Sequence, residues 1–112
     1  MPANAPATPI SRQQVVALLR HLGRDADHIA QTLQRHQVTG RPMSAAACPV
    51  ARYLTERTRG RDGVNRLAAS VTRDHVEVWS GGAHFWVDAP PAVHAFVARF
   101  DAGEFSELWL SA

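Results

Sequence analysis

The sequence contains no lysine and only one cysteine, Cys48, among its 112 residues. A single cysteine excludes a disulfide within the chain and any zinc site built from several cysteines. All twelve basic residues are arginine, and the ten acidic residues leave a formal charge of only +2. So small a net charge is, by itself, no argument for a nucleic-acid partner.

Long apolar runs are also missing. No run approaches the ~18 residues that a membrane-spanning helix needs, so we expect no membrane partner. The first residues are rich in proline and alanine and have neither the basic nor the apolar region of a signal peptide. We therefore expect a disordered tail over residues 1–10, a single domain over residues 11–112 and a cytoplasmic location.

Helical patterns dominate the first half of that domain. Apolar residues at helical spacing predict helices that end near residues 22, 36 and 57. Ser and Asp are common N-cap residues, and proline is favoured at the first helical position. The predicted helix starts are Ser11, then Asp25 or Asp27, then Cys48 or Pro49.

The second half changes to an alternation of apolar and polar residues. This pattern predicts strands over residues 67–72, 75–79 and 83–87, with Gly81 and Gly82 as a hairpin loop. A fourth helix begins at residues 90–91 and ends at Gly103, and a final turn packs Phe105, Leu108 and Trp109 onto the core. The predicted fold class is α+β: three N-terminal helices, a three-stranded antiparallel sheet and a C-terminal helix.

The predicted hairpin has two different faces. If its loop has two residues, Val78 lies opposite Phe85 and Val76 opposite Val87 on an apolar face, joined by Ala69 and Val71. The other face, with Ala68 and Ser70 alongside, carries Glu77, Trp79, His84 and Trp86. A slip of one residue would exchange the two faces.

Two tryptophans on the outer side of a sheet need an explanation, since that side is normally polar. Large exposed apolar patches mark surfaces for partners or ligands. We interpret this face as the site of a small non-enzymatic binding module, for a protein partner, a second copy in a homodimer, or a small ligand. The alternative is that the C-terminal segment or a second subunit covers it for structural reasons. Glu77 and His84 could also transfer protons if a pocket enclosed them.

A second hypothesis is regulatory nucleic-acid binding through the second predicted helix and the cluster of arginines from Arg57 to Arg66. The first two helices resemble a helix-turn-helix in outline, and arginines follow the second and third helices. The candidate contacts are Arg35, Arg41, Arg57, Arg59, Arg61 and Arg66. Asp25 and Asp27 would repel phosphate, and a basic loop can equally be a solvated surface, so this hypothesis is not favoured.

A third hypothesis concerns Cys48 as the thiol of an enzyme or redox sensor. A thiol at a helix N-terminus has a lowered pKa, because the helix dipole and unpaired N–H groups stabilise the thiolate. Free cysteines are nevertheless among the most buried residues, and the alanines before Cys48 suit tight packing. The six histidines have no metal-ligand spacing, and we predict neither a metal nor a cofactor.

Two segments resemble small uncharacterised actinobacterial proteins. The segment at residues 47–54, "ACPVARYL", fits a Cys-Pro-x-Ala-x-Tyr-Leu pattern, and residues 90–108 contain Phe-Asp-x-Gly. Phe105-Ser106 stands where such relatives would have Tyr-Pro. The resemblance implies an actinobacterial, cytoplasmic origin and assigns no activity to any residue.

Overall fold

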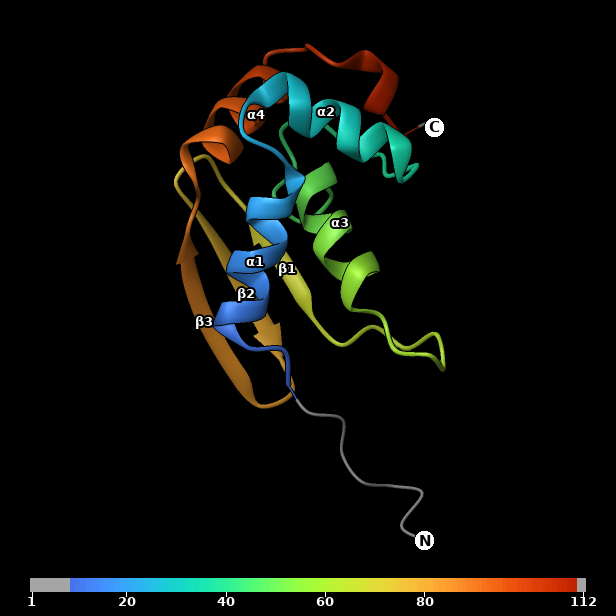
Figure 1. Ribbon diagram of the computed structural model, residues 1–112, viewed down its shortest axis with the longest axis vertical. Helices are drawn as coiled ribbons and strands as arrows, with labels where there is room; N and C mark the ends of the chain where they lie inside the picture. Colours follow the sequence, from blue (N-terminus) through green and yellow to red (C-terminus); the bar gives the residue numbers. More distant parts are fainter. Residues whose placement is uncertain (1–8, 111–112) are drawn as a thin grey trace, which may run out of the picture.

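Four α-helices and a three-stranded antiparallel sheet follow one another in the computed structural model, which describes residues 9–110 (Figure 1). This is the predicted α+β order. The elements are α1 (Arg12–Leu22), α2 (Ala26–Arg35), α3 (Pro49–Thr58), β1 (Ala68–Val71), β2 (His75–Ser80), β3 (Ala83–Asp88), α4 (Pro91–Asp101) and a short 3-10 helix, η1 (Ser106–Leu108).

The helix starts have the predicted caps. Ser11 accepts a hydrogen bond from the backbone N–H of Gln14, and the Gln14 side chain accepts one from the N–H of Ser11. At the start of α2, Asp25 rather than Asp27 is the cap, accepting from the N–H of His28 at 2.8 Å. These bonds satisfy N–H groups that a helix leaves unpaired at its start.

The helices cover only one side of the sheet. α1 packs against β3 and α3 against β1, while α2 packs on α4 beyond one end of the sheet (Figure 1). The core between the layers is fully apolar at its centre, with Val76 and Val78 of β2, and Phe96 and Phe100 of α4, all inaccessible to solvent. Within residues 9–110, no helix lies on the other side of the sheet.

The sheet has the register that the sequence predicts. Val78 pairs with Phe85, Trp79 with His84 and Ser80 with Ala83, so the hairpin loop has two residues. Gly81 adopts a left-handed conformation there, with φ of 58°. In the pairing of β1 with β2, Ala69 lies opposite Val78 and Val71 opposite Val76, so both belong to the buried face. Ala68 and Ser70 belong to the outer side.

The two ends of the chain differ in part from expectation. Residues 1–8, most of the predicted tail, lie outside the described residues. Ile10, which we placed in that tail, is buried in the core, and its N–H donates to Ser80 Oγ at 2.8 Å. In the C-terminal segment Leu108 is buried as predicted, but the Trp109 side chain is 44% exposed, although its backbone forms a bridge with the buried Gly40.

Candidate interaction face

The outer side of the sheet, which we call the outer face, is built by the alternation of the strands. Successive side chains in a strand point to opposite sides, so every second residue of β2 and β3 turns away from the helices. The cross-strand pairs on this face are His75 with Asp88, Glu77 with Trp86, and Trp79 with His84.

Four aromatic rings form a continuous row across the outer face. The Trp79 and His84 rings are stacked, with centroids 5.1 Å apart and planes within 4° of parallel. His84 lies 6.2 Å from Trp86, which in turn meets the edge of His75 at 4.5 Å. Contacts of this kind contribute roughly 0.2–1 kcal/mol per cross-strand pair, so the row also stiffens the hairpin.

A carboxylate lies beside this row of rings. The Glu77 Oε2 atom is 2.5 Å from His84 Nε2, and the Glu77 side chain is only 20% exposed. His84 remains 46% exposed, so the pair is open to water on one side. The pair is therefore not enclosed as the proton-transfer hypothesis supposed, and the contact with Glu77 holds the His84 ring in place against Trp79.

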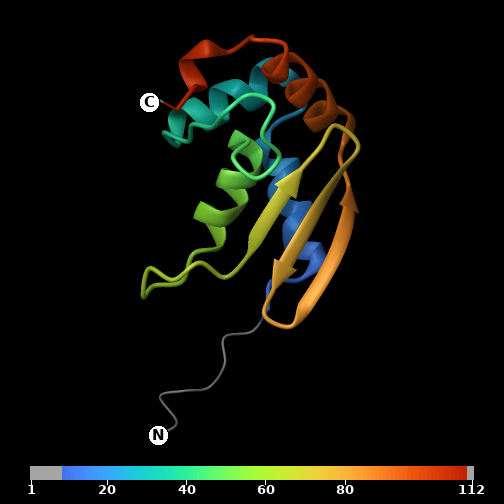
Figure 2. The same cartoon turned by 180° about the vertical axis from the view of Figure 1, so that it is seen from behind.

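The outer face is open. Trp79 is 42% exposed and Trp86 48% exposed. In Figure 2, which views the molecule from the side of the sheet, no other element of the described chain lies over the strands. The C-terminal segment instead lies beside α2, where Gly40 N–H donates to the carbonyl of Leu108 at 2.9 Å. Covering by that segment, the structural alternative, does not occur within residues 9–110.

The backbone edge beside Trp86 is held from the helix side. The Arg12 guanidinium donates a hydrogen bond to the Trp86 carbonyl and lies 5.3 Å from the centre of the Phe85 ring. Arg12 therefore ties the start of α1 to the edge strand. Sequence reasoning missed this contact, because nothing in the chain marks an arginine at a helix start as the partner of a distant strand.

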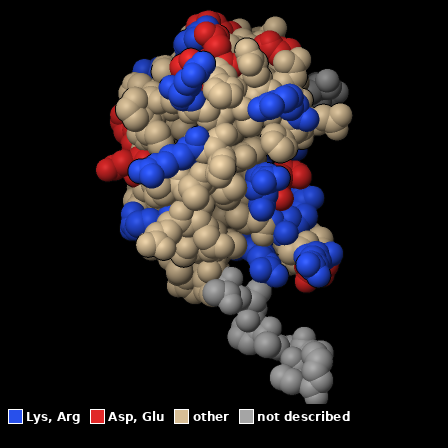
Figure 3. Space-filling model, viewed as in Figure 1, with Lys and Arg blue, Asp and Glu red and all other residues tan. Residues whose placement is uncertain are grey.

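The arginines of the nucleic-acid hypothesis do not form a single cluster, and only three of the six share a groove. Arg57, Arg59 and Arg66 line one groove with Gln14 and Leu18 of α1. Arg41 lies at the other end of α3, where its N–H bonds to Ala47, and Arg35 belongs to α2 and donates to Thr32. Arg61 is exposed in the connection between α3 and β1. Figure 3 shows basic side chains gathered around that connection.

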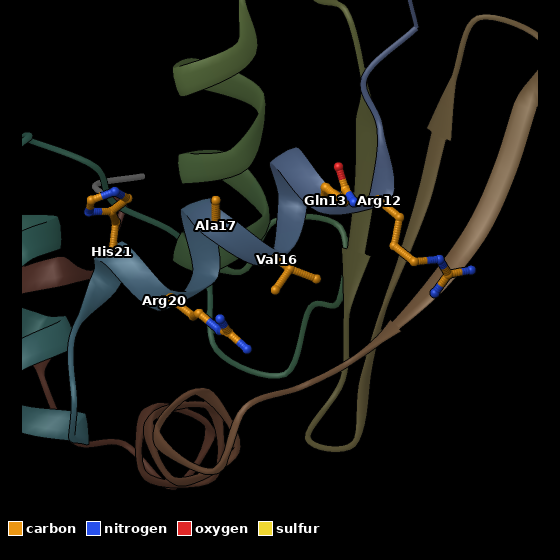
Figure 4. A pocket seen from close by; sticks show the side chains of 6 residues that line it. All are labelled: Arg12, Gln13, Val16, Ala17, Arg20 and His21. Carbon is orange, nitrogen blue, oxygen red and sulfur yellow. The ribbon is translucent and has the colours of Figure 1, made fainter.

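A second groove runs along α1 itself. Its polar lining residues are Arg12, Gln13, Arg20 and His21, and Figure 4 shows Arg12 and Arg20 extending from the helix on either side of Val16. Ala17 lines both this groove and the groove beside α3. Both of these arginine-lined grooves therefore lie along α1, one of them shared with the end of α3, and neither is lined by a residue of α2.

The thiol of Cys48 is not presented to solvent. Cys48 stands directly before α3 but is only 2% exposed. Burial raises its pKa to about 11, although hydrogen bonds from the N–H groups of Val50 and Ala51 act in the opposite direction. Desolvation thus outweighs the effect of the helix N-terminus, and the thiol stays protonated near neutral pH.

Two further findings limit the chemistry of the described region. Within residues 9–110, no three His, Cys, Asp or Glu side chains come together as a metal site would require. None of the helices there is both long and apolar enough to cross a membrane.

No protein-family model, curated protein or solved structure matched this chain. The resemblance of residues 47–54 and 90–108 to small actinobacterial proteins therefore stays a prediction. Function has to be argued from the geometry of the surface, since the fold class alone does not assign one.

Proposed function

We propose that this protein is a small non-enzymatic interaction module that binds a protein partner, or a second copy of itself, through the outer face. The proposal includes a cytoplasmic location, where the single thiol would remain reduced. One observation carries it: Trp79 and Trp86 stand side by side with two histidines on an open sheet surface, each with nearly half its area exposed.

Physical reasoning favours binding over a purely structural role. The cross-strand contacts need only one side of each ring, whereas the exposed area of the tryptophans costs solvation free energy in the free protein. Tryptophan is enriched at binding hot spots because it buries a large area with few rotatable bonds. The apolar face of the sheet supplies the core, and neither outer tryptophan belongs to that core.

The test uses a photo-crosslinking residue at Ser70, which lies on the outer face of β1 opposite Glu77. Illumination of cells that make the protein should give a discrete adduct, either with a partner or with a second copy. Trp79→Ala/Trp86→Ala should abolish it, and Trp109→Ala, which changes an exposed tryptophan elsewhere, should not. No adduct above that from a photo-crosslinking residue at Ala102 would contradict the proposal.

A second candidate, nucleic-acid binding, is favoured by the two arginine-lined grooves that meet at Ala17. Arginine contacts to phosphates dominate the affinity of such complexes and make it strongly salt-dependent. The surface that we propose for it is formed by α1 and the end of α3. In the helix-turn-helix outline, α2 would be the recognition helix. In the structure, the buried side of α2 packs against α4 and η1.

Retention on heparin and binding to single-stranded DNA test this second candidate. Arg57→Gln/Arg66→Gln should reduce both, and the salt slope should fall in magnitude by about 0.7 for each phosphate contact removed. Arg35→Gln/Arg41→Gln removes the same charge away from the grooves and serves as the control. Binding that ignores salt, or that both double variants weaken equally, would exclude the grooves.

A further inference from the structure

The outer face lacks arginine. Strands β1, β2 and β3 contain none of the twelve arginines of the chain. The charged and titratable side chains on their outer side are the carboxylates of Glu77 and Asp88 and the imidazoles of His75 and His84. Apart from the two histidines, the charged side chains of these strands on the outer side are acidic, although the protein as a whole has a formal charge of +2.

Exposed indole rings beside carboxylates are suited to one kind of ligand. The face of an aromatic ring attracts a cation within about 6 Å of its centre, and tryptophan does so most strongly. A carboxylate nearby adds a charge-assisted hydrogen bond to the same cation. On the outer face, the hydrogen bond to His84 uses only the Oε2 atom of Glu77, so its other carboxylate oxygen can accept from such a cation. The second carboxylate, Asp88, is exposed at the end of β3.

From these observations we infer that the outer face recognises a polypeptide segment that presents arginine side chains. This inference rests on the proposed function and specifies the partner. A guanidinium group is planar and weakly hydrated, so it can stack on Trp79 or Trp86 while its edge donates to Glu77 or Asp88. A lysine ammonium is more strongly hydrated and cannot stack in this way.

The same charges argue against two other occupants. An acidic segment would meet Glu77 and Asp88 with like charge, which costs binding free energy. Two copies placed outer face to outer face would bring four carboxylates and no arginine from these strands into one interface. An arginine-bearing partner meets neither difficulty, and it offers the rings a large flat contact.

Peptide titration tests the inference in a Trp109→Phe background, where all tryptophan fluorescence comes from the outer face. The probes are a Gly-Ser peptide with spaced arginines, the same peptide with the neutral isostere citrulline, and a version with glutamate. The arginine peptide should change the fluorescence saturably and bind at least about tenfold more tightly than the citrulline peptide. The glutamate peptide should not bind.

Variants assign the effect to the carboxylates. Glu77→Gln and Asp88→Asn should each weaken the arginine peptide by about threefold to tenfold. Asp62→Asn removes one negative charge in the connection between α3 and β1 and should leave its affinity unchanged. Asp88 is exposed at a strand end, so its variant keeps the test valid if Glu77→Gln disturbs the hairpin.

The failure of this inference can be told apart from the failure of the proposed function. Equal binding of the arginine and citrulline peptides, or unchanged affinity in both carboxylate variants, would overturn arginine recognition. If the Ser70 crosslink still forms in that case, the outer face remains an interaction surface with a different partner. Loss of the crosslink as well would overturn both.

Discussion

Gly40 is a residue whose lack of a side chain is structurally required. A Cβ atom at this position would lie 2.4 Å from the carbonyl oxygen of Ala47 and 2.5 Å from the backbone nitrogen of Pro49. Gly40 also bonds on both sides to the C-terminal segment, accepting from the N–H of Leu110 and donating to the carbonyl of Leu108. The loop before α3 therefore packs backbone against backbone.

We predict that Gly40→Ala destabilises the protein by about 3 kcal/mol, because the backbone of Ala47 or Pro49 has to move. Gly82→Ala is the matched control, since nothing lies within 4 Å of a Cβ at that position. Urea unfolding of the two variants measures the difference in unfolding free energy. Equal stabilities of Gly40→Ala and Gly82→Ala would show that the backbone of Ala47 and Pro49 leaves room for a side chain at Gly40.

A second prediction at this scale concerns Cys48. Its pKa in the folded protein, about 11, is above the ordinary thiol value, so the unfolded chain releases the proton first as pH rises. Stability should therefore fall with rising pH. Relative to Cys48→Ala, the wild type should lose about 1 kcal/mol of unfolding free energy between pH 8 and 10.

The same burial predicts slow chemistry. Native Cys48 should react with a thiol reagent at pH 7 at least about tenfold more slowly than the unfolded chain. Native labelling as fast as that of a model thiol would restore the thiol-dependent hypothesis. For the stability measurement, a difference in unfolding free energy between wild type and Cys48→Ala that does not vary with pH would contradict the raised pKa.

At the scale of the elements, one buried hydroxyl joins three segments. Ser80 at the end of β2 accepts a hydrogen bond from the N–H of Ile10 at 2.8 Å and donates one to the carbonyl of Arg66 at 2.6 Å. It thereby fixes the chain before α1 and the chain before β1 to the hairpin. The arginine groove beside α3 is bounded by two of these segments, since Ile10 and Arg66 both line it.

We predict that Ser80→Ala lowers the unfolding free energy by about 2 kcal/mol, because it leaves the buried N–H of Ile10 and the partly buried carbonyl of Arg66 without this partner. Ser70→Ala, on the outer side of β1, should change it by less than about 0.5 kcal/mol. Thermal unfolding compares the two. A Ser80→Ala variant as stable as Ser70→Ala would show that water replaces the hydroxyl.

The sequence allowed some elements to be predicted and not others, for physical reasons. The hairpin register followed from local pattern, since a two-residue Gly-Gly loop fixes which residues face each other, and the outer face with Trp79 and Trp86 followed from it. The contacts of Ser80 and Gly40 join residues that are far apart in the chain, and no periodicity encodes them. The placement of Arg57 and Arg66 beside α1 was hidden for the same reason.

At the scale of the whole molecule, the two sides of the sheet differ in chemistry. The helix side carries arginine-lined grooves around α1, and the outer face carries aromatic rings with carboxylates. We predict that the groove at Arg57 and Arg66 acts independently of the outer face, because the core lies between that groove and the sheet. Arg57→Gln/Arg66→Gln should leave binding of the arginine peptide within about twofold of the wild type, as distant sites usually behave additively. A larger loss measured by fluorescence titration would show that the surfaces are coupled.

The most direct test of the account is fluorine NMR of the protein labelled with 5-fluorotryptophan, which gives one signal for each of the three tryptophans. Single Trp→Phe variants assign the signals. When extract from cells that make the protein is added, the signals of Trp79 and Trp86 should shift or broaden while that of Trp109 stays unchanged. Unchanged signals from Trp79 and Trp86 in the presence of extract would contradict the claim that the outer face is the interaction surface.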